Sequence, residues 1–254
     1  MTQPASGTGD GQVRSLLAVI DMQRVFGEPD SDWFAPRFAE ILGPVRQLTE
    51  AFAPRVIFTR FIAPQQPAGA WRQYYEQWPF ALQPPGARIY ELVDEFADQP
   101  GPTLDATTFS KWGPELASLL GGGHSAGGDS AGGDNAGGDS AGGDSAGGDS
   151  AGGDSASGDS ASGDSASGDS GSPGELVLAG VSTDCCVLST AVAAADAGVA
   201  VRVVANACAG ATDESHEQAL EILRLYAPLI EVVSLAEILD EVSESGGDGG
   251  IRAE

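Results

Sequence analysis

The segment GVSTDCCV at residues 180–187 places two thiols where a predicted strand turns into a predicted helix. Backbone N–H groups at a helix N-terminus lower the pKa of a thiol and can also bind an oxyanion. This arrangement indicates a cysteine nucleophile, and spacing alone does not separate Cys185 from Cys186. The alternative is that both are small buried residues that pack the helix against the sheet.

Histidine chemistry is poorly represented, because the chain holds only His124 and His216. His124 opens a low-complexity stretch, and His216 lies in the first turn of a polar helix, where a solvated or capping role is the simplest interpretation. A Ser–His–Asp triad or a Cys–His pair needs a well-placed imidazole. The sequence also has no G-x-S-x-G, H-E-x-x-H or C-x-x-C motif. A cysteine nucleophile here therefore needs a base other than histidine.

Short apolar runs that alternate with helical stretches must position these residues. The predicted strands are Leu16–Ile20, Arg55–Thr59, Glu175–Ala179, Ala200–Ala205 and Ile230–Val233. The predicted helices are Pro36–Phe52, Pro114–Leu120, Cys185–Ala197, Glu214–Tyr226 and Leu235–Val242. Such short, nearly continuous apolar strands suit a parallel sheet that is covered on both faces. We predict an α/β fold: a single doubly wound domain, with a mostly parallel sheet of about six strands and helices on both faces.

Three chemistry-bearing positions follow directly on predicted strands. Asp21 and Arg60 each come after an apolar run, and the cysteine-bearing segment comes after Gly180. In open parallel sheets the working residues gather beyond the carboxyl ends of the strands. We therefore expect Asp21, Arg60 and the cysteines to lie near one another.

A repeat interrupts this domain. Residues 125–169 are nine pentads of the type SAGGD, NAGGD or SASGD, with no Leu, Ile, Val or aromatic residue, so they bury too little apolar surface to order. Regularly spaced Asp residues could bind cations, but the pentad matches neither the EF-hand loop nor the nonapeptide calcium repeat. The predicted organisation is a disordered tail at 1–12, one domain formed by 13–120 and 175–242, a disordered insert at 121–174 and a disordered tail at 243–254.

Charge and composition exclude several kinds of partner. The net charge is −25 for the chain and about −16 outside the pentads, which disfavours nucleic acid and anionic membranes. No apolar run reaches the roughly 18 residues of a membrane span, and the N-terminus does not resemble a signal peptide. Three cysteines, two of them adjacent, make no disulfide framework, so we expect a cytoplasmic protein.

Two segments resemble a known superfamily. AVIDMQRVF at residues 18–26 and AGVSTDCCVLSTAVAAADAGVAVRVVANACAG at residues 179–210 are similar to the two strongest signatures of the isochorismatase-like cysteine hydrolases. That superfamily includes nicotinamidases and N-carbamoylsarcosine amidohydrolases. The resemblance implies a hydrolase that cleaves a C–N bond of a small amide, ureide or carbamoyl compound through a thioester. It also implies a homo-oligomer, a dimer or a tetramer.

Carried over residue by residue, the resemblance assigns most of the site. Cys186 matches the nucleophile, whereas Cys185 occupies a variable position. Asp21 matches the base. The backbone N–H groups of Ser182 and Cys186 match the oxyanion hole, with a cis peptide between Val181 and Ser182. Gln23 and Phe26 are expected to line the substrate pocket near Asp21.

One family residue is missing. The superfamily places a catalytic lysine four positions before a serine, in a K-x-x-x-S-x-[FW] pattern, and that position is Ala106 here. The chain's only lysine, Lys111, lies five residues further on, and we predict that it replaces the missing cation, with Arg60 as a second candidate. The alternatives are an exposed Lys111 and a catalytically inactive protein that serves as a binding or scaffold module.

The segment after the second predicted strand indicates whether the protein binds a metal ion. Nicotinamidases carry metal-binding histidines there, but residues 59–64 read TRFIAP, so we predict no metal and no cofactor and argue against a nicotinamidase. The following region, 61–90, is rich in Pro and aromatic residues. We predict that Trp71 from this region and Trp112 from the family pattern line the substrate site; the alternative is that the loop aromatics only pack the loop onto the domain or a partner subunit.

Overall fold

The computed structural model describes residues 15–99, 101–121 and 174–246. The predicted tail at 1–12, nearly all of the predicted insert and the end of the predicted C-terminal tail lie outside these residues. The strands are β1 (Leu16–Ile20), β2 (Val56–Phe61), β3 (Thr103–Ala106), β4 (Glu175–Val181), β5 (Ala200–Ala209) and β6 (Ile230–Val233). The helices are α1 (Arg24–Gly27), α2 (Phe38–Phe52), α3 (Ala70–Gln77), α4 (Pro114–Leu120), α5 (Leu188–Asp196), α6 (Asp213–Arg224) and α7 (Leu235–Gly246). Short 3-10 turns occur at Pro79–Ala81, Arg88–Tyr90 and Asp94–Phe96, and a π-helical turn occupies Thr183–Val187.

The six strands form one parallel sheet in the order β3-β2-β1-β4-β5-β6. Neighbouring β1 and β4 run in register from Leu16 beside Leu176 to Ile20 beside Gly180. The chain leaves β1 toward one edge of the sheet and returns to β4 to build the other half. In such sheets the point where the strand order reverses opens a crevice at the carboxyl ends, so the ends of β1 and β4 are the expected place for a site.

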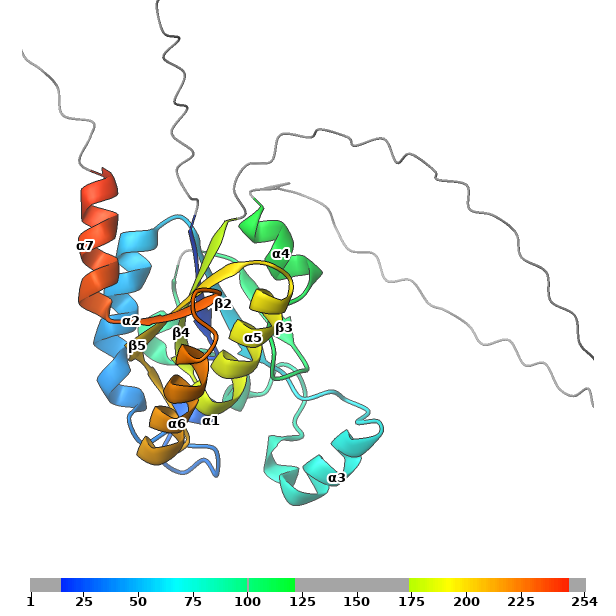
Figure 1. The fold of residues 1–254 in the computed structure, drawn as a ribbon. Coiled ribbons are helices and arrows are strands. Elements are labelled where there is room, and N and C mark those ends of the chain that lie inside the picture. The colour runs from blue at the N-terminus through cyan, green and yellow to red at the C-terminus, as the bar shows by residue number, and fades with distance from the viewer. Residues whose placement is uncertain (1–14, 100, 122–173, 247–254) are drawn as a thin grey trace, which may run out of the picture. The chain divides into compact units, whose positions relative to one another are not determined.

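Helices cover both faces of this sheet (Figure 1). On one face the buried residues include Leu17 and Val19 of β1 and pack with residues of α2 and α7. On the other face Ala18 and Ile20 pack with residues of α4, α5 and α6. The alternation of β1 between two apolar cores explains why its sequence is apolar at every position. The predicted doubly wound α/β class is confirmed.

Several elements differ from the sequence prediction. β3 was not predicted because TLDA alternates exposed and buried residues at the sheet edge and so lacks an apolar run. α3 lies inside the aromatic region that was predicted to be a loop. β5 continues four residues beyond its predicted end. α7 continues to Gly246, into the predicted disordered tail, and Ser243 Oγ donates a hydrogen bond to Leu239 O in this extension.

No helix among the described residues is both long enough and apolar enough to span a bilayer.

Gly180 allows the close approach of β1 and β4 beside the expected site. Its φ is +112°, and a Cβ at this position would lie 2.1 Å from Ile20 O. Any side chain therefore clashes with the backbone of the neighbouring strand and also strains its own backbone.

We predict that Gly180→Ala lowers the free energy of unfolding by about 3 kcal/mol or more, because both strands are buried and neither can yield. Urea unfolding followed by circular dichroism measures this change. Gly43→Ala in α2 is the matched control, since a Cβ there meets no atom within 4 Å, and it should be neutral or mildly stabilising. Equal effects of the two substitutions would contradict the prediction.

Candidate active site

The cysteine-bearing segment leaves β4 through a cis Val181–Ser182 peptide, as the resemblance implied, and enters the π-helical turn before α5. Cys186 is buried at the inner side of this turn, and Cys185 is half-buried. Asp184 braces the turn, because its Oδ1 accepts hydrogen bonds from Ser182 Oγ at 3.0 Å and from Ala211 N at 2.9 Å. The turn thus holds the two thiols at the carboxyl end of β4.

Asp21 follows β1 directly and is fully buried. Its φ of +50° is unusual for a non-glycine residue. Thr59 in β2 donates a hydrogen bond to Asp21 Oδ1 at 2.8 Å, and Lys111 Nζ lies 2.9 Å from Asp21 Oδ2. The Lys111 and Asp21 side chains are both 0% exposed, so the ion pair is completely shielded from water. Lys111 is therefore not an exposed loop residue, which was the alternative to its role as the replacement cation.

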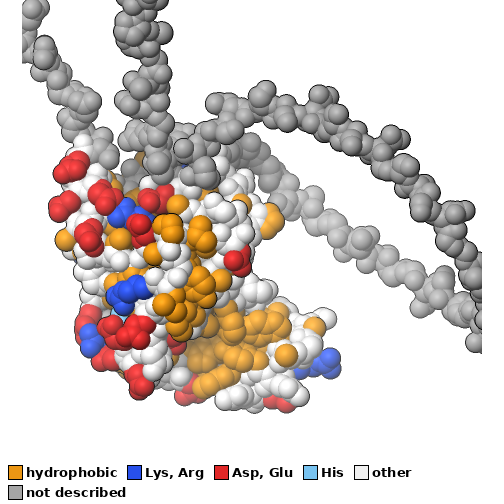
Figure 2. All heavy atoms as spheres, in the orientation of Figure 1, with side chains coloured by type: hydrophobic (Ala, Val, Ile, Leu, Met, Phe, Trp, Pro, Cys, Tyr) orange, Lys and Arg blue, Asp and Glu red, His pale blue; other side chains and the backbone are white. Residues whose placement is uncertain are grey.

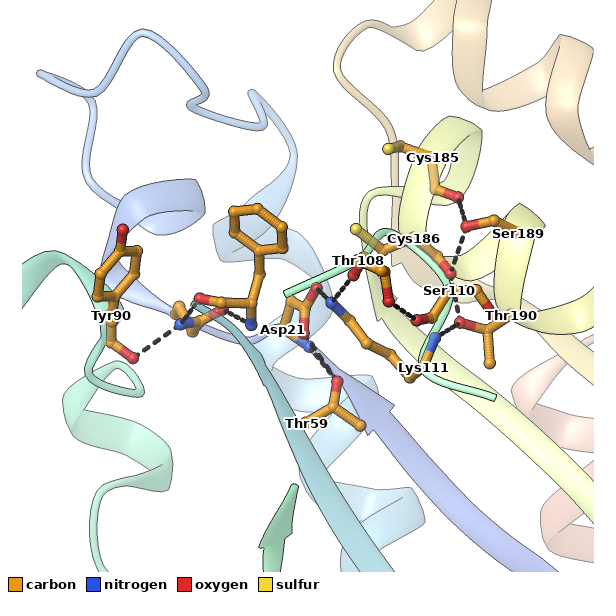
Figure 3. A network of polar contacts seen from close by, with 12 residues as sticks. Asp21, Thr59, Tyr90, Thr108, Ser110, Lys111, Cys185, Cys186, Ser189 and Thr190 are labelled. Carbon is orange, nitrogen blue, oxygen red and sulfur yellow. Dashed lines mark hydrogen bonds and ion pairs between the residues drawn. The ribbon is translucent and has the colours of Figure 1, made fainter. Parts of the chain in front are cut away.

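Backbone hydrogen bonds hold Lys111 in place between β3 and α4 (Figure 3). Its Nζ donates to Thr108 O at 3.0 Å, and its own N–H donates to Thr190 Oγ1 at 2.8 Å. Thr190 in turn donates to Cys186 O at 2.6 Å. Lys111, Thr190 and Cys186 thus form one connected group, although Lys111 and Thr190 are 79 residues apart.

The two thiols differ in their acidity. The hydrogen bond with Cys185, burial and the nearby Asp21 carboxylate raise the pKa of the Cys186 thiol, and the Lys111 ammonium only partly offsets them. The hydrogen bond with Cys186 lowers the pKa of the Cys185 thiol. Cys186 therefore keeps its proton in the resting site, and a base must remove that proton before the sulfur can attack. Asp21 is the nearby carboxylate whose charge acts on this thiol, and its Oδ2 faces the Lys111 ammonium.

We predict that iodoacetamide modifies Cys185 at a lower pH than Cys186. Alkylation requires the thiolate, and the pKa shifts of the two thiols have opposite signs. Cys208 should not react in the folded protein, because burial raises its pKa to about 12. Tandem mass spectrometry of the labelled peptides, with the unfolded protein as control, measures the order; Cys186 labelling at the lower pH would contradict it.

A cavity of about 280 Å³ opens onto the two thiols. Ser182, Asp184, Cys185 and Cys186 line it from the turn after β4, and Asp32 and Ala211 contribute from other segments. The rest of the wall is aromatic and consists of Phe26, Trp33, Phe34, Phe61, Tyr74, Trp78 and Phe109. Burial and the neighbouring cysteines raise the pKa of Tyr74 to about 12, so its ring stays neutral. A cavity of this size suits a small molecule.

Four residues that were predicted to bind substrate do not line this cavity. Gln23 is fully buried, where its amide donates to Phe61 O and Tyr90 O and accepts from Phe61 N, so it joins the segment after β1 to the end of β2 and to Tyr90. Arg60 forms a bidentate pair with Asp105 on the neighbouring strand.

The two predicted tryptophans also point elsewhere. Trp71 packs on Tyr74, Tyr75 and Phe109, behind the cavity wall. Trp112 packs against the core on the α4–α5 face of the sheet. Of the predicted binding residues, only Phe26 lies in the wall.

Several site residues were missed in the sequence. Trp33 is central to the wall and contacts the rings of Phe26, Phe61, Tyr74, Trp78 and Phe80. Its only sequence signal is an aromatic pair, Trp33-Phe34, shortly after the D-M-Q segment. His216 was expected to be solvated or capping, but it is half-buried and its Nδ1 shares a hydrogen bond with Thr183 Oγ1 at 2.8 Å. It thus contacts the nucleophile turn without reaching the cavity.

Comparison with known proteins supports the resemblance. Residues 169–237 match the family model of the Isochorismatase domain. No curated protein sequence matches the chain. Among solved structures, a cysteine hydrolase from Pseudomonas syringae pv. phaseolicola is similar with a TM-score of 0.65 and 17% identity, covering 96% of this chain and 100% of that one.

Two further structures extend this similarity. A nicotinamidase from Bacillus subtilis gives a TM-score of 0.55 at 19% identity, covering 87% of this chain and 99% of that one. An N-carbamoylsarcosine amidase from Thermoplasma acidophilum gives 0.54 at 16% identity, covering 87% and 96%. Over residues 169–237 the chain thus matches the Isochorismatase domain, and its fold is that of the isochorismatase-like hydrolases, which confirms the resemblance predicted from the sequence.

Proposed function

We propose that this chain is a cysteine hydrolase that cleaves a C–N bond of a small amide, ureide or carbamoyl compound. The observation that carries the proposal is the buried Asp21–Lys111 pair beside Cys186, at the reversal point of the sheet. A buried ion pair is costly to form, so its position next to a thiol in an open cavity favours a chemical role.

In the proposed reaction Asp21 Oδ2 takes the proton of the Cys186 thiol, and the sulfur attacks the substrate carbonyl carbon. The carbonyl oxygen becomes an oxyanion that the backbone N–H groups of Ser182 and Cys186 stabilise. The C–N bond then breaks, and Asp21 returns its proton to the departing amine or ammonia. This leaves a thioester on Cys186.

Hydrolysis of the thioester repeats these steps with water. Asp21 removes a proton from the water molecule, the hydroxide adds to the thioester carbonyl, and the C–S bond breaks. The thiolate of Cys186 recovers its proton from Asp21, and the acid product leaves. Lys111 holds the Asp21 carboxylate in place between turnovers, because its ammonium lies 2.9 Å from Asp21 Oδ2.

Lys111 also bears on the alternative of an inactive binding protein. That alternative rested on Ala106 in place of the family lysine, but the ammonium of Lys111 reaches the Asp21 carboxylate from further along the chain. The three similar structures are of a cysteine hydrolase, a nicotinamidase and an amidase, and they give the inactive alternative no support.

A panel of primary amides, ureides and carbamoyl compounds tests the proposal. We expect ammonia release from at least one class, together with an acyl adduct on Cys186 that hydroxylamine removes. Cys186→Ser should lose thioester formation, and Cys185→Ser should still carry the adduct on Cys186. An adduct on Cys185, or a panel with neither turnover nor adduct, would contradict the proposal.

A further inference from the structure

The cavity has a chemical bias that the reaction alone does not require. No described lysine or arginine lines it, whereas two carboxylates, Asp32 and Asp184, do. Lys111 is buried behind the wall and neutralised by Asp21. The described charges at the cavity therefore give it a negative electrostatic potential. The net charge of the whole chain, −25, has the same sign.

Neither carboxylate is neutralised by a described partner. Asp32 is exposed at the cavity and forms no ion pair with any described residue. Asp184 accepts hydrogen bonds from Ser182 and Ala211, which are neutral groups. The nearby His216 brings no compensating charge at neutral pH, because burial lowers its pKa.

The aromatic wall of the cavity also favours a positively charged ligand. Trp33 stands at its centre, with ring centroids 6.1 Å from those of both Tyr74 and Trp78. On the face drawn in Figure 2, hydrophobic side chains gather over α3 and beside it, in the part of the chain that supplies Tyr74. Aromatic faces attract a desolvated cation through their quadrupoles, most strongly those of Trp.

We infer that the substrate carries a positive charge: the acyl part of the cleaved amide bears an ammonium or quaternary ammonium group that the aromatic wall and Asp32 hold. That the bound cation is an amide substrate rests on the proposed function, but the preference of the cavity for a cation is a separate property. An anionic substrate is disfavoured, because it would lie against two carboxylates and no described lysine or arginine lines the cavity to pair with it.

Matched amides test the inference. The amide of trimethylglycine and the amide of tert-butylacetic acid have the same shape and differ by one positive charge. The monoamide of succinic acid supplies a negative charge. Binding is measured by calorimetry and tryptophan fluorescence on Cys186→Ser, with tetramethylammonium as a bare probe against sodium at equal ionic strength. Turnover of the same amides is measured by ammonia release from the unmodified protein.

We expect the cationic amide to bind about tenfold more tightly than its neutral isostere, and the anionic amide to bind least. Asp32→Asn should reduce the preference for the cation about threefold. Asp30→Asn is the matched control, because Asp30 is exposed on the same segment but does not line the cavity, and it should leave the preference unchanged.

Each outcome separates the inference from the proposed function. Equal or tighter binding of the neutral isostere, or no binding of tetramethylammonium at tens of millimolar, overturns the inference, even if the amides are hydrolysed. Selective binding of the cation without hydrolysis of any amide supports the inference and counts against the hydrolase proposal.

Discussion

Replacing Lys111 by methionine is expected to lower the free energy of unfolding by about 3–5 kcal/mol and to abolish most of the hydrolytic activity. Methionine fills a similar volume but leaves the fully buried Asp21 carboxylate without its positive partner. The unpaired carboxylate is then no longer held in place to accept the proton of Cys186. Urea unfolding at neutral pH and ammonia release from the best amide of the panel measure the two effects.

Two controls test whether charge, and not packing, causes the loss. The double variant Asp21→Asn with Lys111→Met removes both charges and should recover most of the stability but none of the activity. Arg60→Met breaks the Arg60–Asp105 pair, whose side chains are 29% and 45% exposed, and should cost less than about 1 kcal/mol. If the double variant is as unstable as Lys111→Met, the unpaired charge is not the cause.

The second large effect is expected for Asp21→Asn, which should lower kcat/KM by about 10²- to 10⁴-fold. Asparagine keeps the shape of the side chain but cannot take the proton of Cys186. The change also removes a negative charge that raises the pKa of the Cys186 thiol, so the alkylation profile of Cys186 should move to lower pH. The variant therefore combines a thiol that ionises more readily with a much slower reaction.

This combination distinguishes a base from a carboxylate that only raises the pKa of the thiol. If Asp21 acted only through its charge, its removal would move the pH profile of Cys186 to lower pH without slowing the reaction. The melting temperature of Asp21→Asn, compared with that of the double variant, shows how much of the loss comes from instability. Unchanged kcat/KM in a folded Asp21→Asn protein would remove Asp21 from the mechanism.

The sequence was sufficient for the fold class and for the parts of the site that local pattern controls. Fully apolar short runs such as Leu16–Ile20 identified buried parallel strands, because a strand covered on both faces has no polar side. Asp21 and the cysteine-bearing turn follow such strands directly, so their place at the carboxyl edge followed from the predicted topology. Edge strand β3 escaped prediction because half of its side chains face solvent.

Tertiary structure decided which of the remaining residues reach the site. Lys111 was one of two candidate cations, and the hydrogen bond between its N–H and Thr190 joins its loop to the helix that follows Cys186. Arg60 lies near the end of β2, beside the strand that precedes Asp21. Its guanidinium nevertheless pairs with Asp105 on the neighbouring strand β3. Which of the two cations lies beside Asp21 depends on contacts between segments far apart in sequence, and local periodicity does not predict such contacts.

The cavity wall shows the same division. The sequence by itself determined that aromatic residues crowd the region after β2, but Trp71 packs behind the wall while Tyr74 and Trp78 line it. Trp33 joins them from the segment after β1, and two carboxylates complete a surface that carries no described lysine or arginine. Strand ends are set by backbone pairing that a residue pattern encodes, whereas the wall is set by how separate loops pack against one another. The place of Asp21 and of the cysteine-bearing turn could therefore be predicted before the fold was known, but the residues that line the cavity could not.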